Sequence, residues 1–576
     1  MTENLTLSHE RVDDIPVLIG LEQQLGLSEL LDQCLGHHGL HQGLSNGVLA
    51  SIWMAFIGSE GDHRKSTVQD WAERHRQVLE RLVGQPIRTV EFSDDRLGIV
   101  LRRLSRTAEW EALEQELWAK TVAVSDVDLS GVRLDSTTAY GYHTPTEEGV
   151  MQLGHSKDHR PDLAQVKVMA AATEPSGHLL ACDVVSGQCA DDPLYLPVIE
   201  RVRQIVGRTG LLYSGDAKMA ALSTRAAIVA HQDYYLMPLP LTGHTRAEFD
   251  GWVERAVEPG KQEAVELLWD GPRLLGAGYE FDREVSAEVA GQALVWSERV
   301  QVLRSGDLAR RQTADLRERL DEAAAAIRAL TPAPGRGKRQ FADETALTAA
   351  IATVEQQYRV SGLLAVTWQR EETSLTRYVG RGRAGPTRPT RTELTVRYVV
   401  TDVDLQEEVI TRQQERLGWR VQVTNLPRDR MTLPQAVLHY RGGWSLERDF
   451  HLLKDRPLGI SPLFVRDNEQ IIGLTRLLSL VLRLLTLIEI RVRHGLAQAH
   501  ATLDGLYEGQ ASRTTDRPTA PRLLKAFARA EITLTRVGLG NHLLWHITPL
   551  TRRLERILAY LDLPPLLYAA LADNSS

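Results

Sequence analysis

The sequence predicts an α/β protein with a mixed central sheet, a β-rich insertion and helical regions at both ends. Three observations lead to this class. Apolar residues recur at helical steps over the first 120 residues and again after residue 520. Between residues 125 and 240, alternating and short apolar runs indicate strands separated by helices. Further strand-like segments fill much of the stretch from 241 to 430.

The composition is that of an ordinary globular protein. The chain has 576 residues, of which 43% are hydrophobic and 25% charged, so several domains are expected. A formal net charge of −8 and a pI near 6.2 exclude a general polycation, so any surface for nucleic acid must be local. The three cysteines form no CxxC pair and the first residues contain no signal-peptide-like apolar stretch, which favours the cytoplasm.

The segment 471–492 is apolar enough to be mistaken for a membrane span. Polar residues nevertheless recur along it at three- and four-residue steps: Arg476, Ser479, Arg483 and Thr486. Charge at the centre of a span is costly and rare. We therefore expect a buried core helix with one solvent-facing edge, in a soluble protein.

Residues 123–240 have the element order of a ribonuclease-H-like core. Three strand-like stretches come first, followed by a helix that begins at Asp192-Pro193. A short apolar run then ends at Gly215-Asp216, and a second helix leads to the strand DYYLMPLP. In that fold, acids at the ends of adjacent central strands face one point.

Two aspartates stand at such strand ends. Asp135 lies in the sequence Arg-Leu-Asp-Ser-Thr-Thr, and Asp216 lies between the apolar run and Lys218. An aspartate at a strand end is most often a turn former or a helix cap. The other interpretation is a pair of catalytic carboxylates, which would need a third acid.

The stretch YRGGWSLERDFHLLK supplies a candidate for that third acid. Read as one helix, it has a single polar face, because residues three and four apart stack over each other. The residues on that face are Tyr440, Trp444, Glu447, His451 and Lys454. A glutamate beside an aromatic residue, a histidine and a lysine has no packing role. We therefore interpret Glu447 as an acid that faces a functional site. An ordinary surface helix of mixed charge is the alternative.

The spacing resembles the third-acid signature of bacterial insertion-sequence transposases, Tyr-x2-Arg-x3-Glu-x6-Lys. Tyr440, Glu447 and Lys454 are in register with it. One position departs, because Gly443 stands where the signature has arginine and Arg441 lies two positions earlier.

The resemblance covers most of the chain. Leu-Asp-Ser-Thr at Asp135 and Gly-Asp-Ala-Lys at Asp216 resemble the first- and second-acid motifs of the same family. Other segments that resemble it are GHSKDHRPD, GQCADDP, YYLMPLP and VQVTNLPRDRMTLPQAVLHYRGGW. Each motif alone is weak, but three acid motifs in the expected order make the resemblance specific.

This resemblance implies a transposase of the Asp-Asp-Glu (DDE) type. Asp135, Asp216 and Glu447 would be its catalytic acids and would bind two Mg²⁺ ions, which Mn²⁺ can replace. Carboxylates suit Mg²⁺ because it is a hard cation that prefers oxygen ligands. By resemblance, water cuts the transposon end and the freed 3′-OH joins target DNA, without a covalent protein–DNA intermediate.

The same resemblance implies contacts with double-stranded DNA around the acids. Tyr440 and Lys454 would bind the phosphate near the cleaved end. Arg441 is the candidate to replace the missing arginine, and Lys218 lies beside the second acid. Trp444 either stacks on an unpaired base or packs in the core.

The long insertion before Glu447 also resembles a subgroup of these transposases that carries a β-rich insertion. Between residues 370 and 397 it holds seven arginines against three glutamates, including Arg381 and Arg383. Arginine suits phosphate because of its planar fork. A solvated loop is the ordinary explanation of such a run, but a local excess in an acidic protein favours contact with the DNA backbone.

These interpretations divide the chain into five regions. They are a helical N-terminal region (1–122), the first part of the ribonuclease-H-like core (123–240), the insertion (241–430), the second part of the core with the Glu447 helix (431–500) and a helical C-terminal region (501–576). The N-terminal region either binds DNA ends and mediates dimerisation or only packs against the core.

Two DNA ends must be held together, so at least a homodimer on DNA is expected, in a bacterial cytoplasm. Two other functions stay open. One is a non-catalytic DNA-binding protein derived from a transposase, and the other is a metal-dependent nuclease of the same fold.

Overall fold

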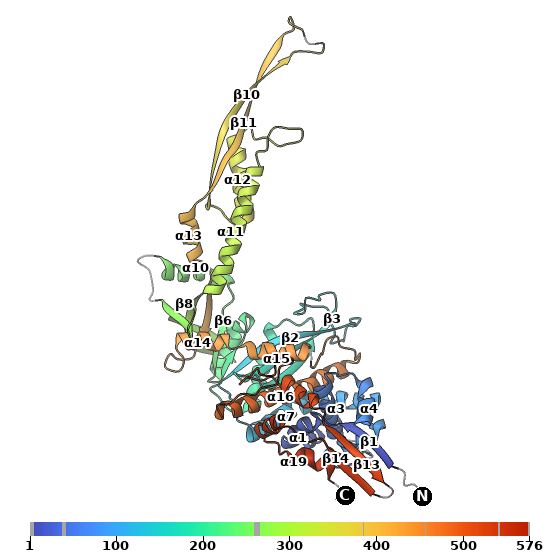
Figure 1. Ribbon diagram of the computed structural model, residues 1–576. Helices are drawn as coiled ribbons and strands as arrows, with labels where there is room; N and C mark the ends of the chain where they lie inside the picture. The colour runs from blue at the N-terminus through green and yellow to red at the C-terminus, as the bar shows by residue number, and fades with distance from the viewer. Residues whose placement is uncertain are drawn as a thin grey trace.

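The computed structural model describes residues 5–36, 42–258, 265–383, 385–455, 457–539 and 542–573. It shows a mixed α/β body from which a long arm projects (Figure 1). Both ends of the chain contribute to the body, and the arm comes from the middle of the sequence.

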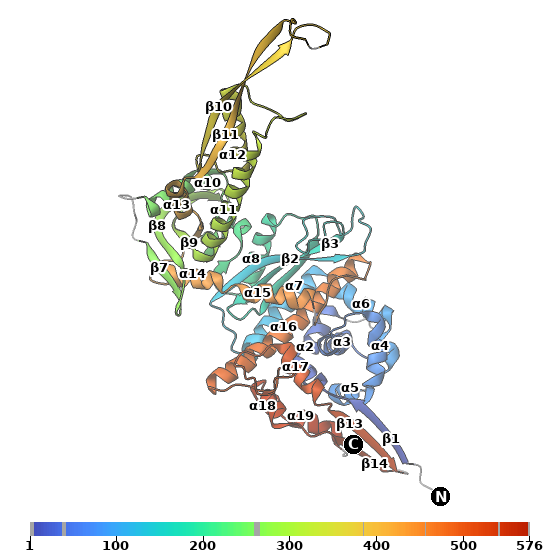
Figure 2. The ribbon, with the colours of Figure 1, turned by 45° about the horizontal axis from the view of Figure 1, so that its top comes forward.

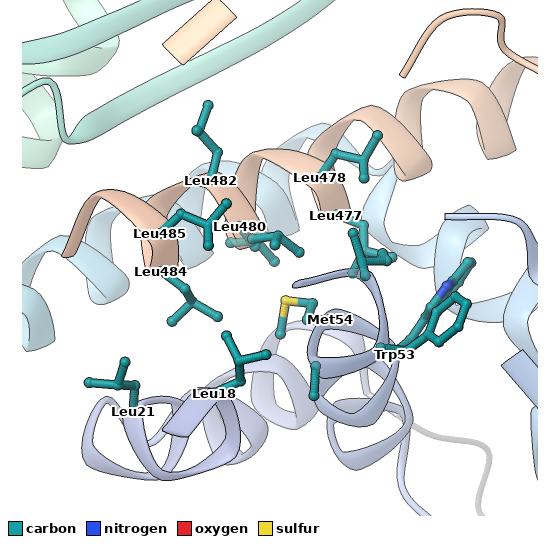
Figure 3. Close-up of a cluster of buried hydrophobic side chains, with 14 of the residues drawn as sticks. Leu18, Leu21, Trp53, Met54, Leu477, Leu478, Leu480, Leu482, Leu484 and Leu485 are labelled. Carbon is teal, nitrogen blue, oxygen red and sulfur yellow. The ribbon is translucent and has the colours of Figure 1, made fainter. Parts of the chain in front are cut away.

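The centre of the body is one long helix, α16 (Asn468–Gln498), which contacts helices from both ends of the chain. Its N-terminus is capped by Asp467, whose side chain accepts a hydrogen bond from the N–H of Glu469. Leucines along α16 pack against Leu18 and Met54 (Figure 3). Full burial of one leucine side chain contributes about 1.5–3 kcal/mol, so this helix is a main source of the body's stability.

The elements around α16 are mostly helical, but they include a three-stranded sheet. Strand β1 (Leu5–Arg11) pairs antiparallel with β13 (Thr533–Leu539), which pairs with β14 (His542–Ile547). The expectation of all-helical ends misses this sheet, because its polar, alternating strands give no long apolar run. The helices are α1 (Ile15–Gln24), α2 (Leu27–Leu35), α3 (Asn46–Glu60), α4 (Lys65–Arg74), α5 (Arg76–Val83), α6 (Asp94–Leu104), α7 (Thr107–Val124), α17 (Ala520–Arg529), α18 (Arg552–Tyr560) and α19 (Leu566–Ala569).

The polar stripe of α16 does not face solvent, so the expected wet edge is wrong. Arg476 and Arg483 are each 4% exposed. Arg476 donates to the backbone oxygen of Leu104 at 2.9 Å, and Arg483 donates to the Glu114 carboxylate at 2.5 Å. The stripe therefore forms a buried polar interface between α16 and the helices α6 and α7. Among the described helices, α16 alone is long and apolar enough to cross a membrane, and 94% of its most apolar window is buried inside the protein.

A nine-stranded mixed sheet forms the other half of the body, in the order β4-β3-β2-β5-β6-β12-β9-β8-β7. Strand β2 is antiparallel to β3 and parallel to β5, and β5 is parallel to β6. The strands are β2 (Gly131–Gly141), β3 (Ala164–Glu174), β4 (Leu179–Ser186), β5 (Leu212–Ser214), β6 (Tyr234–Pro238), β7 (Glu266–Asp270), β8 (Arg273–Val289), β9 (Gln292–Ser305) and β12 (Trp419–Thr424).

The expected insertion therefore contributes partly to the core sheet. Strand β12, which follows the arm in sequence, lies between β6 and β9 and is antiparallel to both. Strands β7, β8 and β9 extend the sheet beyond it. On one face of the sheet, α8 (Tyr195–Val206) and α10 (Gly243–Val257) pack, and on the other face α16 and its neighbours pack.

The arm consists of helices packed against a long antiparallel ribbon. Its elements are α11 (Gly306–Ala329), α12 (Glu344–Tyr358), β10 (Leu364–Tyr378), β11 (Thr390–Leu405) and α13 (Glu407–Glu415). Leu320, Ile327 and Leu347 are buried between these elements, so the base of the arm has a core of its own. The outer half of the ribbon continues past the helices, away from the body (Figures 1 and 2).

Candidate active site

Asp135 lies on one of two parallel strands, and Asp216 lies just beyond the end of the other. Asp135 is on β2, and Asp216 lies two residues after the last residue of β5. The two strands pair with Arg133 opposite Ser214. The same register, carried two residues further, puts Asp135 beside Asp216. Because side chains two apart on a strand share a face, Arg133 and Asp135 point to the same side of the sheet.

Glu447 is not on one continuous helix with Tyr440, as the sequence predicted. Helix α14 (Leu433–Arg441) begins with a capping box between Thr432 and Gln435. It ends before two glycines, and α15 (Trp444–Lys454) then carries Glu447 in its first turn. The polar face expected over 440–454 is therefore divided between two helices.

Arg133 explains the glycine at position 443. A Cβ on Gly443 would overlap the Arg133 guanidinium. That guanidinium also donates to the backbone oxygen of Tyr440 at 3.2 Å, lies 5.1 Å from the centre of the Tyr440 ring and pairs with Glu174. An arginine from β2 thus fills the junction between α14 and α15.

The three acids nevertheless line one small pocket, of about 180 Å³. Asp135 comes from β2, Asp216 from the end of β5 and Glu447 from α15. The other residues that line this pocket are Arg133, Leu134, Gly215, Tyr440, Arg441, Gly443, Trp444 and Leu446. Three acids that are far apart in sequence therefore line the same pocket.

Asp135 is held by a lysine that the sequence analysis did not single out. The Lys157 ammonium lies 3.0 Å from an oxygen of Asp135 and also donates to the backbone oxygen of Ser136. Burial raises the pKa of Asp135, Lys157 acts in the opposite direction, and the charge of Asp216 raises it further. The two aspartates are thus close enough to influence each other's charge.

Asp216 is oriented by two donors. Its carboxylate accepts a hydrogen bond from the Tyr195 hydroxyl at 2.7 Å and from the backbone N–H of Lys218 at 2.9 Å. Burial and the nearby Asp216 raise the pKa of Tyr195 far above its ordinary value. Tyr195 therefore remains a neutral phenol that donates to Asp216.

A buried aspartate beside this pair was also missed. Asp191 accepts hydrogen bonds from Ser136 at 3.0 Å and pairs with Lys167 at 2.6 Å and Lys218 at 2.5 Å. Although burial raises its pKa, the two lysines hold the pKa of Asp191 well below its usual range. Lys157 and Asp191 lie in GHSKDHRPD and GQCADDP, segments covered by the family resemblance, but nothing in their spacing identified these residues.

The predicted DNA-contacting residues fall into three groups. Tyr440, Arg441 and Trp444 line the pocket, and Trp444 is 48% exposed, which excludes the core position. Lys218 pairs with Asp191, and Lys454 pairs with Asp158 of the loop 154–162 at 2.5 Å. Arg381 and Arg383 lie at the far end of the arm, remote from the acids.

All three acids are carboxylates, and carboxylate oxygens are ligands that a hard divalent cation prefers. Within the described ranges, however, no three His, Cys, Asp or Glu side chains converge closely enough to hold a metal ion. The charge of Asp216 acts on Asp135, and Lys157 supplies positive charge to Asp135. Glu447 is exposed on α15 and borders the same pocket.

The similarity of this chain to known proteins is distant and structural. No family model matches the sequence, and no curated protein matches it. The structure is similar to the piggyBac transposase in a synaptic complex with hairpin DNA, with a TM-score of 0.34 and 7% sequence identity. The matched region covers 98% of this chain and 86% of that chain.

Proposed function

We propose that this chain is a DDE transposase, which cuts DNA strands at transposon ends and joins them to target DNA. The observation that carries the proposal is the meeting of Asp135, Asp216 and Glu447 around one pocket. Each acid comes from a different element, and each lies in a sequence motif that resembles the corresponding motif of that family.

A ribonuclease-H-like assignment of the core is part of the proposal. It is supported by the order β4-β3-β2-β5-β6, in which three antiparallel strands are followed by two strands parallel to β2. The helix α8 connects β4 to β5, as the sequence order requires. Residues 241–430 would then be the insertion, although β7, β8, β9 and β12 continue the core sheet.

The proposed cofactor is a pair of Mg²⁺ ions, which Mn²⁺ can replace. Asp135 would contact both ions, and Asp216 and Glu447 would each contact one. When bound there, the ions would stabilise the attacking and leaving oxygens of an in-line displacement at phosphorus. The Lys157 ammonium must leave the Asp135 carboxylate before a cation can take its place.

The remaining residues of the pocket suit the handling of a DNA strand. Arg441 and Trp444 are exposed at its rim, where a guanidinium can bind phosphate and an indole can stack on a base. Burial raises the pKa values of both Tyr195 and Tyr440, so neither phenol is suited to act as a nucleophile. Water and a DNA 3′-OH remain the proposed attacking groups.

The lysines near the pocket are proposed to exchange partners on DNA binding. Lys454 is paired with Asp158, and Lys218 with Asp191, in the absence of DNA. A phosphate near the cleaved end would compete with these carboxylates for the ammonium groups. We further propose that the protein acts as a homodimer on DNA in a bacterial cytoplasm, and that residues 1–122 contribute to holding the ends.

A second candidate is a non-catalytic DNA-binding protein derived from a transposase. One observation favours it: among the described residues, the acids do not converge as a closed metal site. A nuclease of the same fold, which cuts without joining, uses the same pocket and differs only in the reaction products.

Strand cleavage tests these alternatives directly. Purified protein is incubated with a labelled duplex that carries the element's own end, with Mg²⁺ or Mn²⁺ or with EDTA. The variants Asp135→Ala, Asp216→Ala and Glu447→Ala should lose cleavage and keep DNA binding. Glu408→Ala, on the exposed surface of α13, is the control and should cleave normally.

The products separate the three functions. Metal-dependent cutting followed by joining supports a transposase, and cutting alone supports a nuclease. If the wild type binds the duplex without cutting it, the result supports the non-catalytic DNA-binding protein. Cleavage retained by Asp135→Ala would contradict the proposed active site.

A further inference from the structure

The arm carries several exposed cations that have no carboxylate partner. Six exposed cations there make no ion pair within the part of the chain that the structure describes: Arg336, Lys338, Arg339, Arg381, Arg383 and Arg391. An uncompensated cluster in a protein of net charge −8 indicates a surface for an anionic partner.

The acids of the ribbon do not neutralise this cluster. Each of its glutamates already has its own arginine, in the pairs Glu371–Arg397 at 2.6 Å, Glu372–Arg370 and Glu393–Arg377 at 3.6 Å. The glutamates of the ribbon therefore do not neutralise the six other cations.

These cations lie on two separate segments of the arm, at different distances from the body. Arg381 and Arg383 lie in the loop that joins β10 to β11, and Arg391 is on β11 itself. Arg336, Lys338 and Arg339 lie in the loop between α11 and α12. That loop is fixed to the ribbon, because Phe341 forms an antiparallel bridge with Tyr398 and the N–H of Val400 donates to the Thr331 hydroxyl at 3.1 Å.

The end of the ribbon is built to hold its shape. The pairing of β10 with β11 continues to Tyr378 and Thr390, the last residues before the loop. Arg388 folds back over that loop, donating to the backbone oxygens of Val379, Gly380 and Gly382 and lying 5.4 Å from the Tyr378 ring. The two strands thus present a preorganised ribbon, an element that fits the major groove of duplex DNA.

The length of the arm separates this surface from the acids. Helix α11 has 24 residues and so spans about 36 Å. The ribbon from Val400 to Thr390 adds about 33 Å at about 3.3 Å per residue. Both views show the ribbon leading away from the body (Figures 1 and 2). The reach is about 70 Å, or roughly 20 base pairs at 3.4 Å per base pair.

We propose that the arm, from its α11–α12 loop to the tip of its ribbon, is a second DNA-binding surface, which contacts duplex backbone about 10 to 20 base pairs from the strand held at the acids. The proposal rests on the proposed function for the identity of the DNA. It adds that affinity depends on duplex length and that six residues far from the pocket carry this dependence.

Binding to duplexes of two lengths tests the proposal. Both contain the same element end, one of about 10 base pairs and one of about 60 base pairs, so only the longer can extend along the arm to its tip. The test variant replaces all six cations by alanine. The control variant, Arg310→Ala with Arg311→Ala, removes exposed charge near the root of α11.

The wild type and the control should bind the long duplex at least tenfold more tightly than the short one. The six-site variant should bind both duplexes equally, and the short one as the wild type does. Its slope of log affinity against log salt on the long duplex should fall by about 0.9 for each phosphate that the variant no longer neutralises.

Length-independent binding by the wild type would overturn the arm proposal alone. If the wild type binds neither duplex, the proposed function fails as well. A variant that loses dimerisation in light scattering while keeping its affinity for long DNA would assign the arm to a second copy of the chain instead. A variant that weakens equally on both duplexes would also contradict the proposal.

Discussion

The guanidinium of Arg133 occupies the space that a side chain on residue 443 would need. Arg133 is on β2, two residues before Asp135, and residue 443 directly precedes the helix that carries Glu447. This pair therefore sets the junction between the strand of the first acid and the helix of the third. Glu174, only 3% exposed, completes the junction by pairing with both Arg133 and His439.

Gly443→Ala should destabilise the protein, because its Cβ would overlap the Arg133 guanidinium. Overpacking of a buried site typically costs about 1–3 kcal/mol in the free energy of unfolding. The thermal midpoint measures this loss, and cleavage should fall with it because Glu447 is displaced. Gly251→Ala is the control, since a Cβ on Gly251 meets nothing within 4 Å.

The double variant Arg133→Ala with Gly443→Ala should lose less than the sum of the two single losses. An additive result would show that the two positions act independently. An unchanged midpoint for Gly443→Ala would contradict the steric explanation of the glycine.

Lys157→Met should bind Mn²⁺ more tightly than the wild type. Its ammonium pairs with Asp135 at 3.0 Å and must be displaced by an incoming cation. A partly exposed pair is worth about 0.5–1 kcal/mol, which corresponds to roughly a two- to fivefold gain in affinity. Calorimetric titration with Mn²⁺ measures it, Asp135→Asn gives the blank, and Arg160→Met in the same loop is the control. Weaker binding by Lys157→Met would contradict the prediction.

Asp191→Asn should destabilise the protein, whereas the adjacent Asp192→Asn should not. Asp191 is buried between Lys167 and Lys218, and the Lys167 side chain is 5% exposed. Loss of one partner of a buried pair typically costs about 3–5 kcal/mol, because it leaves a buried charge uncompensated. Asp192 is exposed. Equal thermal midpoints for the two variants would exclude a structural role for the Asp191 network.

The stability of the protein should depend on pH through His178. Burial, helped by the charge of Arg483, lowers the pKa of His178 to about 3 from an ordinary value of 6.5. Below pH 6.5 the unfolded chain binds a proton that the folded chain does not, so stability falls with pH until the folded pKa is reached. The loss approaches about 1.4 kcal/mol per pH unit.

His178→Asn should remove this component from the pH dependence of the thermal midpoint between about pH 6.5 and pH 3. His155→Asn, at an exposed loop position, should leave the wild-type dependence unchanged. Parallel curves for wild type and His178→Asn would show that the buried imidazole does not titrate on unfolding.

The sequence motifs singled out the candidate acids, but not all of the elements that carry them. Asp135, Asp216 and Glu447 were identified from local motifs, and they meet because the parallel register of β2 and β5 and the position of α15 follow from the strand order. The break before Trp444 was missed, since helical spacing alone does not reveal that Arg133 fills the place of a side chain at Gly443. That contact joins residues remote in sequence.

The same limit explains the buried polar groups. The stripe of Arg476 and Arg483 looked like a solvent edge because periodicity shows that a face is polar, but not what covers it. Its partners, such as Glu114, come from a helix more than 300 residues earlier. Asp191 and Asp192 are likewise adjacent and chemically identical, and only the fold decides which one is buried.

The pairing of β1 with β13 has a consequence for biosynthesis. A ribosome adds about 5–20 residues per second, so roughly 25 to 100 seconds pass between synthesis of Leu5–Arg11 and that of Thr533–Leu539. During this time β1 is an unpaired edge strand, open to association with other chains. A product terminated before β13 keeps that open edge permanently. Premature termination should therefore yield aggregation-prone chains rather than a shortened, independently stable protein.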